Sequence, residues 1–218
     1  MKISVITPSF NQGKYIERTI LSVINQRGSF ELEYIIIDGG STDNTLDLIK
    51  KYQDSLTWIS ETDRGQSDAI NKGFNMATGD LFAWLNADDT YEENALSEVV
   101  ERYREYRFKW CFGNCRNINE DDQEIRRLIT RYKIAESKRY SYRRLLSKDF
   151  ISQPAVFFTK DIYREIGPLD INCQYSMYKK AAYETYLTAK RHATTQDKYL
   201  ILRHYLHYRM LSLVYRFL

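Results

Sequence analysis

The sequence predicts an α/β fold with a mainly parallel central sheet flanked by helices. Short apolar, β-branched runs alternate with amphipathic stretches through the first hundred of the 218 residues, which is typical of strands joined by crossover helices. The run YIII at 34–37 is continuous, as in a strand buried on both faces. With 43% apolar and 28% charged residues, the chain is long and apolar enough to form a sizeable core.

The elements of this first part follow from their spacing and their end signals. Strands are expected at 3–6, 34–37, 56–60 and 81–85, and helices at 14–25, 45–52, 67–77 and 90–103. The first helix has Ile16, Ile20 and Val23 at helical spacing. Thr90 and Glu93 match a capping box, which predicts that the last of these helices begins there.

The second part of the chain is less regular. Strands are expected at 109–112 and 155–158, around a basic, tyrosine-rich stretch at 126–146. From Lys198 onward, apolar residues alternate with arginines and no acid occurs, so we expect an amphipathic basic helix. Such a helix either packs on the domain or lies on an anionic membrane surface.

The charge is divided unevenly. Residues 1–100 hold 8 Lys and Arg against 16 Asp and Glu, whereas the remainder holds 24 against 13. An acidic half suits cation binding, and a basic half suits an anionic lipid, a polyanion or a diphosphate. Eight of the cations lie between 126 and 144 among tyrosines; a solvated surface along an acceptor groove accounts for them, and we expect no nucleic-acid partner.

The composition also bears on location. No apolar run reaches the roughly 20 residues that span a bilayer, and the first residues do not form a secretory signal. Three cysteines cannot close a disulfide set, and Cys111 and Cys115 lack a second pair of zinc ligands. We therefore expect a cytoplasmic protein, with a peripheral contact at the inner face of the membrane left open.

Polar residues follow the four strand runs of the first part, at 7–11, 38–43, 61–68 and 86–89. Parallel strands bring their carboxyl ends to one edge, so these segments should converge. The sequence lacks both GxGxxG and the phosphate loop GxxxxGK[ST], which argues against a dinucleotide site and a P-loop. Carboxylate and amide oxygens at this edge suit Mg²⁺ or Mn²⁺ held jointly with substrate phosphates.

Four blocks at this edge resemble a known family. TPSFNQGKYIERTILSVINQ, YIIIDGGSTDNT, ETDRGQSDAINKGF and GDLFAWLNADD are similar to the nucleotide-sugar domain of family-two glycosyltransferases, inverting enzymes of the GT-A fold, of the type found in bacterial polysaccharide biosynthesis. The likeness continues more weakly to residue 170. It implies a glycosyltransferase domain at 1–170, with a nucleotide-sugar half at 1–100 and an acceptor-side half at 101–170, followed by a helical extension at 171–218.

The resemblance implies a set of nucleotide-sugar residues: Thr7, Pro8, Asn11, Asp38, Asp63, Arg64, Gly65, Asp68, Asn71, Lys72, Asn86, Ala87 and Gln153. Asp38 stands where an aspartate of the family recognises the base, and Gly39 stands where a second aspartate is common. An alternative for Asp68 and Lys72 is an ion pair on a helix surface. For Gln153 the alternative is a polar strand-edge residue before a proline.

The resemblance also implies a metal site at the Asp-x-Asp motif, which here reads Asn86-Ala87-Asp88 and is followed by Asp89. Asp88 and Asp89 are the expected ligands of Mn²⁺ or Mg²⁺. An amide oxygen of Asn86 can still face a cation or a ribose hydroxyl. Asp89 has a structural alternative, because it precedes the predicted capping box and could settle the helix N-terminus.

The catalytic base is the point at which the sequence departs from the family. The family carries an acid on a helix about ten residues after a segment like GPLD, but 174–182 contains no carboxylate. The candidates are Glu184 and Asp170. A surface pair with Lys180 is the alternative for Glu184, and a turn or capping role is the alternative for Asp170.

The resemblance implies a metal-dependent inverting glycosyltransferase. The enzyme would move a sugar from a nucleoside-diphosphate sugar, with UDP-sugar the commonest in the family, to a hydroxyl of a glycan or lipid-linked acceptor in cell-surface polysaccharide synthesis. An alternative is a nucleotide-sugar-binding scaffold that lacks the base. The two differ in whether substitution of Asp170 and Glu184 affects sugar transfer.

Overall fold

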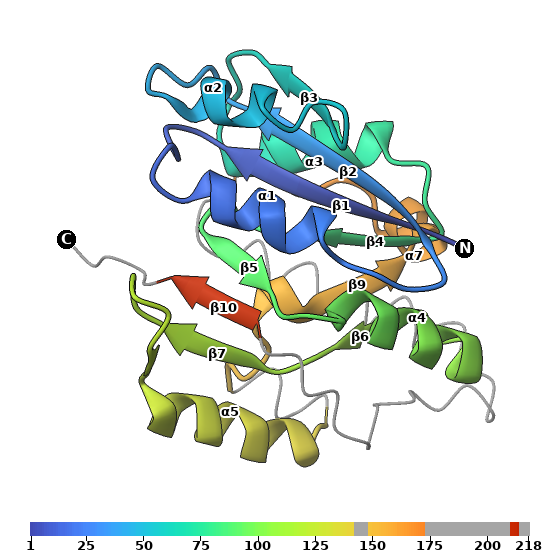
Figure 1. Cartoon of the computed structure of the whole chain (residues 1–218). Coiled ribbons are helices and arrows are strands. Elements are labelled where there is room, and N and C mark those ends of the chain that lie inside the picture. Colours follow the sequence, from blue (N-terminus) through green and yellow to red (C-terminus); the bar gives the residue numbers. More distant parts are fainter. Residues whose placement is uncertain (142–147, 173–209, 214–218) are drawn as a thin grey trace.

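The computed structural model describes residues 1–141, 148–172 and 210–213, and its centre is a six-stranded sheet (Figure 1). In spatial order, the strands are β3 (Thr57–Ser60), β2 (Glu31–Asp38), β1 (Lys2–Ser9), β4 (Leu81–Trp84), β9 (Val156–Thr159) and β6 (Trp110–Phe112). The first four run parallel, and β9 is antiparallel to both of its neighbours. The expected α/β class with a mainly parallel sheet is confirmed.

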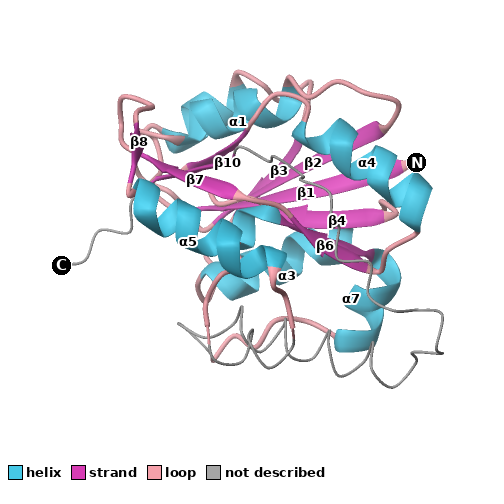
Figure 2. Cartoon of the chain, turned by 90° about the horizontal axis from the view of Figure 1, so that it is seen from below, coloured by secondary structure: helices cyan, strands magenta, loops and turns pink. Residues whose placement is uncertain are grey.

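Helices lie on both faces of this sheet. The helices of the described residues are α1 (Ile16–Ile24), α2 (Thr45–Lys50), α3 (Gln66–Met76), α4 (Ala95–Tyr106), α5 (Arg127–Lys138) and α7 (Lys160–Ile166), with a short 3₁₀ turn, η1 (Gln153–Ala155). Figure 2 shows α1 and α4 on one side of the sheet and α3 on the other. Within the described ranges, no helix has the length and apolar character needed to cross a membrane.

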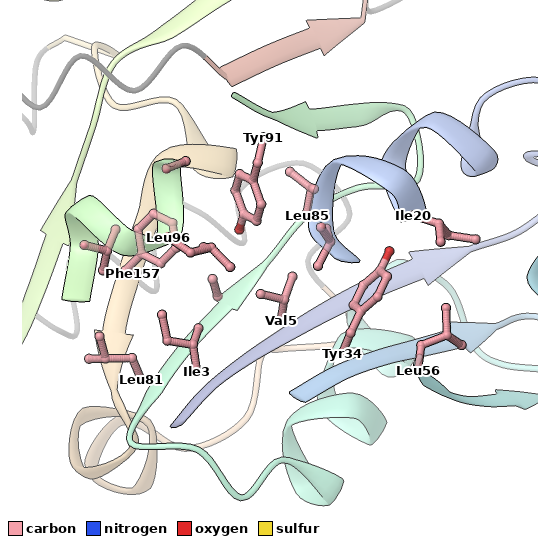
Figure 3. Packing of buried hydrophobic residues seen from close by; sticks show 14 of the residues in the cluster. Ile3, Val5, Ile20, Tyr34, Leu56, Leu81, Leu85, Tyr91, Leu96 and Phe157 are labelled. Carbon is pink, nitrogen blue, oxygen red and sulfur yellow. The ribbon is translucent and has the colours of Figure 1, made fainter. Parts of the chain in front are cut away.

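The core forms two layers because successive side chains of a strand point to opposite faces. Ile3 and Val5 of β1 belong to a cluster with Ile20 of α1 and Leu96 of α4 (Figure 3). Ile6, one position further along β1, belongs to a second cluster with residues of α3. The continuous apolar runs in the sequence therefore correspond to strands covered on both faces.

A second, four-stranded sheet lies beside the first (Figure 1). Its order is β5 (Asp89–Tyr91), β10 (Met210–Leu213), β7 (Cys115–Ile118) and β8 (Glu124–Ile125). β10 is antiparallel to β5 and parallel to β7. The sequence does not predict these strands, because they are two to four residues long and the segments of β5, β7 and β8 contain no continuous apolar run.

The predicted capping box is wrong. Thr90 lies in β5, where it is buried and pairs with Leu211 of β10. The helix begins later, at Ala95, behind Asn94, which has a left-handed backbone conformation and makes no capping bond with its side chain. Residues 89–91 form backbone pairs with another strand, so they cannot enter the helix.

The predicted helix from Lys198 is also wrong where it can be compared. Residues 210–213 form β10 between β5 and β7, and the rest of the predicted helix lies outside the described residues. Periodicity alone does not separate a short strand from a helical segment. Residues 210–213 form a strand because β5 and β7 offer backbone hydrogen-bond partners on both sides of it.

Candidate functional site

The carboxyl ends of the central strands meet at one edge, as predicted from the parallel order. Ser9 at the end of β1 is in register with Asp38 at the end of β2, and Ile6 of β1 is in register with Trp84 at the end of β4. The loops that follow these strands carry most of the predicted nucleotide and metal residues. The hydrogen bonds among these loops show which polar groups are already used within the chain.

Asp38 is completely buried, and the chain itself supplies its hydrogen-bond donors. The Oδ2 atom accepts from the backbone N–H of Gly40 at 3.0 Å, from the N–H of Ser41 at 2.8 Å and from the hydroxyl of Ser60 at 2.7 Å. The Ser41 hydroxyl donates to Oδ1. Four donors therefore hold this carboxylate between the ends of β2 and β3.

Asn11 and Thr7, at the end of β1, also bond within the chain. The backbone N–H of Asn11 donates to the Ser41 hydroxyl at 2.8 Å, and its Oδ1 atom accepts from the N–H of Thr42 at 2.9 Å. The hydroxyls of Thr7 and Tyr34 lie 3.0 Å apart in the core. Burial raises the pKa of Tyr34. Pro8 is buried in the same strand.

The block before α3 is a network of charges. Asp68 accepts from the backbone N–H of Arg64 at 3.1 Å and from its guanidinium at 3.2 Å. The hydrogen bond from the Arg64 side chain is the main reason that the pKa of Asp68 is lowered. Lys72 Nζ lies 2.8 Å from Glu61 and 3.8 Å from Asp68. The ion pair considered for Asp68 and Lys72 is therefore present.

Asn71 connects α3 to the segment that precedes Asp170. Its side-chain amide donates to the carbonyl of Leu169 at 2.9 Å, and its Oδ1 accepts from the N–H of Leu169 at 2.8 Å. Asp170 accepts from the N–H of Asn172 at 3.0 Å, which is the turn geometry considered as its alternative. Glu184 lies outside the described residues.

The Asn86–Asp89 segment joins the start of α3 to β5. The side chain of Gln66 donates to Asn86 Oδ1 at 2.7 Å, and the amide of Asn86 donates to Asp89 Oδ2 at 3.2 Å. Asp89 is 3% exposed and opens β5, so the structural alternative for it, a role at a helix N-terminus, is wrong. The carbonyl of the buried Ala87 accepts from the Thr19 hydroxyl.

Asp88 differs from its neighbours. Its side chain is half-buried, and desolvation raises its pKa. Among the described residues, no cation pairs with it, and no three His, Cys, Asp or Glu side chains gather into a metal site. A partly desolvated carboxylate suits a divalent cation that takes most of its other ligands from substrate phosphates and water. The donor set therefore fits Mn²⁺ or Mg²⁺ shared with a diphosphate.

Gln153 supports the same segment from the other side. It begins the 3₁₀ turn after the segment at 148–152, and its Nε2 donates to the carbonyl of Trp84 at 2.6 Å. Its buried Oε1 has no hydrogen-bond partner in the described part of the chain. Gln153 thus fixes the backbone just before Asn86, and one of its acceptor atoms is not used by the described residues.

Sequence reasoning missed Gln66, Ser41 and Tyr34. Each contacts a predicted site residue from another element: Gln66 orients Asn86, Ser41 joins Asn11 to Asp38, and Tyr34 contacts Thr7. All three lie within blocks that resemble the family, and this position is the one signal that could have drawn attention to them. The contacts themselves depend on tertiary packing.

The sequence matches the family Glycosyl transferase family 2 over residues 4–167. A relative from Nostoc sp., an uncharacterized glycosyltransferase, is 41% identical over 108 residues, which cover 48% of this chain and 33% of the relative. A PGL/p-HBAD biosynthesis glycosyltransferase of Mycobacterium tuberculosis is 30% identical over 174 residues, which cover 77% of this chain and 63% of the relative. The matched part therefore spans between a third and two thirds of these relatives.

Solved structures show the same fold. Staphylococcus aureus TarS superposes with a TM-score of 0.65 at 16% identity, covering 98% of this chain and 35% of TarS. The mannosyltransferase PcManGT of Pyrobaculum calidifontis, solved with GDP-Man and Mn²⁺, gives a TM-score of 0.62 at 19% identity, covering 86% of this chain and 51% of PcManGT. With the family match and the sheet order, these similarities lead to one assignment. The chain belongs to glycosyltransferase family 2 and has the GT-A fold.

Proposed function

We propose that this chain transfers a sugar, with inversion, from a nucleoside-diphosphate sugar to a hydroxyl of a glycan or lipid-linked acceptor. The observation that carries the proposal is Asp88, a desolvated carboxylate at the carboxyl edge of the sheet with no cationic partner among the described residues. Structures of TarS with UDP and with UDP-GlcNAc, and of PcManGT with GDP-Man, support the donor class. The proposed reaction is a step in cell-surface polysaccharide synthesis.

Asp88 is the proposed principal protein ligand of Mn²⁺ or Mg²⁺, with Asp89 beside it. When bound, the cation neutralises charge on the departing diphosphate. The chain's part is to hold the carboxylates in place. Asn86 is fixed by Gln66 on one side and by Asp89 on the other, and Gln153 fixes the carbonyl of Trp84. A site held by such supports loses little free energy to reordering when it binds a diphosphate.

The loops after β1 and β2 form the proposed nucleoside side of the site. The Asp38 network joins the ends of β2 and β3, and Asn11 joins the end of β1 to the same loop. Arg64 and Lys72 contribute positive charge near the diphosphate, although both already pair with Asp68. We infer that these internal bonds preorganise the loops around the donor.

The acceptor hydroxyl requires a carboxylate that removes its proton as the hydroxyl attacks the anomeric carbon. Asp170 and Glu184 are the two candidates. The segment before Asp170 is held against α3 by both hydrogen bonds of Asn71, which supports a fixed position for this acid. The scaffold alternative predicts donor binding without transfer, and substitution of both acids separates the two hypotheses.

The basic second half is the proposed membrane or acceptor side, and α5 is its best described part. Leu128 is 79% exposed and Ile129 is 46% exposed, beside the exposed Arg127 and Arg131. The one acid of this helix, Glu136, is buried. Exposed apolar and cationic side chains together suit an anionic bilayer. We expect flotation with phosphatidylglycerol vesicles, reduced in Leu128→Ser and strongly reduced on vesicles of neutral lipid. Equal flotation on neutral vesicles would contradict the electrostatic part of the proposal.

The proposed activity is tested by incubating the protein with Mn²⁺ and a panel of UDP- and GDP-sugars, and measuring release of the nucleoside diphosphate with and without glycan acceptors. We expect release from at least one donor, and its loss in Asp88→Asn. Asp54→Asn is a matched control, because it makes the same change at an exposed turn. Equal release by wild type and Asp88→Asn would overturn the assignment of the metal ligand.

A further inference from the structure

Gly39, directly after β2, lies against the side chain of Asp63. A Cβ atom built on Gly39 would lie 2.7 Å from Oδ2 of Asp63 and 3.2 Å from its Cγ. Its backbone is fixed by a hydrogen bond from its N–H to the carbonyl of Ser9 at 2.8 Å. A side chain at position 39 and the carboxylate of Asp63 therefore cannot both occupy this space.

The Asp63 carboxylate is held by one of its two oxygens. Oδ1 accepts from the backbone N–H of Gly65 at 2.7 Å. Oδ2, which is the atom nearest to Gly39, has no hydrogen bond or ion pair within the described ranges. The side chain is half-buried. The structure thus presents one oriented carboxylate oxygen beside the end of β2.

The neighbouring carboxylate is not available in the same way. Asp38 is completely buried, and its two oxygens accept four hydrogen bonds from the chain. A ligand that approached it would have to displace one of these donors, which would leave a buried polar group unsatisfied. Of the two aspartates at this corner, Asp63 is the one with an oxygen that accepts no hydrogen bond from the described residues.

We infer that Asp63 reads the base of the nucleotide, in the place that a second aspartate at position 39 would occupy. This inference rests on the proposed function and refines its donor class. A carboxylate accepts hydrogen bonds and cannot donate them. Uracil and guanine each present a ring N–H on their pairing edge, whereas the corresponding atom of cytosine is an acceptor. Asp63 therefore selects UDP or GDP over CDP, a molecule of nearly the same size as UDP.

The substitutions follow from this geometry. Asp63→Ala removes all three atoms that a Cβ at position 39 would approach. The double variant Gly39→Asp with Asp63→Ala then supplies a carboxylate to the same space from position 39 instead of position 63. Gly39 does not have a left-handed backbone, so an aspartate is tolerated there. Asp54→Asn, at an exposed turn, controls for the change in charge.

The test is calorimetric titration of UDP, GDP and CDP with MnCl₂ present. For wild type we expect the better of UDP and GDP to bind more tightly than CDP. Asp63→Ala should reduce this preference by about tenfold, the effect of losing a hydrogen bond to a charged group, and the double variant should restore most of it. Thermal melting of each variant checks that it is folded.

The outcomes separate this inference from the proposed function. If wild type prefers UDP or GDP, and Asp63→Ala retains that preference unchanged, the base is read elsewhere and the inference is wrong, while the donor site stands. If Asp63→Ala loses the preference and the double variant does not regain it, a carboxylate in the space shared by positions 39 and 63 does not determine the preference, and the inference is again wrong. If wild type binds no nucleotide, the proposed function itself fails.

Discussion

Two strand ends of the same sheet carry aspartates in opposite situations. After β2, Asp38 is fully buried and receives four hydrogen bonds from the chain. After β4, Asp88 is half-buried, and desolvation raises its pKa although a hydrogen bond with its own backbone lowers it in part. Among the described residues, no cation pairs with this carboxylate. Both residues stand where the family's motifs place ligand-binding acids, yet the first is used by the fold and the second is not.

The difference teaches that position in a motif does not by itself define a ligand-binding group. A carboxylate whose acceptor sites are occupied stabilises the loop that holds it, and it binds a ligand only by giving up a bond. A carboxylate whose desolvation is only partly compensated raises the free energy of the folded chain, and a cation relieves that cost. We propose that the number of internal donors separates structural from functional aspartates at this edge.

The largest effect expected from this comparison is on stability. Asp38→Ala leaves the N–H groups of Gly40 and Ser41 and the hydroxyl of Ser60 without their acceptor. We expect the free energy of unfolding to fall by about 2–4 kcal/mol, as for other buried networks. Urea denaturation measures it. A midpoint within error of wild type would show that these bonds contribute little.

A smaller loss is expected at the link between α3 and the segment before Asp170. Asn71→Ala removes both hydrogen bonds to Leu169, at an expected cost of about 1–2 kcal/mol. Hydrogen exchange at the amide of Leu169 should accelerate, while exchange in β1 should change no more than the global stability requires. Unchanged protection of Leu169 would mean that Asn71 does not hold this segment.

The smallest effect has the opposite sign. Because burial raises the pKa of Asp88 in the folded chain, this residue disfavours folding at pH values above its folded pKa, and the penalty disappears below its ordinary value of about 3.9. Asp88→Asn should therefore have a higher Tm than wild type at pH 7, in the absence of metal. The gap should close as the pH falls toward 4. A lower Tm at pH 7 would reveal an internal partner for Asp88.

Much of the fold could be predicted from the sequence, because several elements have a recognisable apolar pattern within their own segment. The strands 34–37 and 81–85 and the helix 67–77 are long enough for their apolar pattern to be read, and each is found within a few residues of its expected bounds. The strands β5 and β8 are shorter than these, and β7, although as long as β4, has no apolar run. The tail segment 210–213 pairs with strands that are distant in sequence, and no local pattern reports such a partner.

The site could be predicted as a meeting of strand ends, but its internal bonds could not. Parallel order brings Asn11, Asp38 and Asn86 to one edge, as expected. The partners that decide their roles, such as Ser60 for Asp38 and Gln66 for Asn86, come from other elements. Sequence alone therefore identifies which residues gather at this edge and leaves open which of their polar atoms are used within the chain.

The most direct test of the account is calorimetric titration of UDP into wild type and Asp88→Asn, each with and without Mn²⁺, with Asp54→Asn as the charge-matched control. We expect wild type and the control to bind UDP in a Mn²⁺-dependent manner. The Asp88→Asn variant should lose about tenfold to a hundredfold in affinity with the metal present, the effect of losing a charged ligand. Equal Mn²⁺-dependent affinities in wild type and Asp88→Asn would contradict the central claim that Asp88 is the functional carboxylate of this edge.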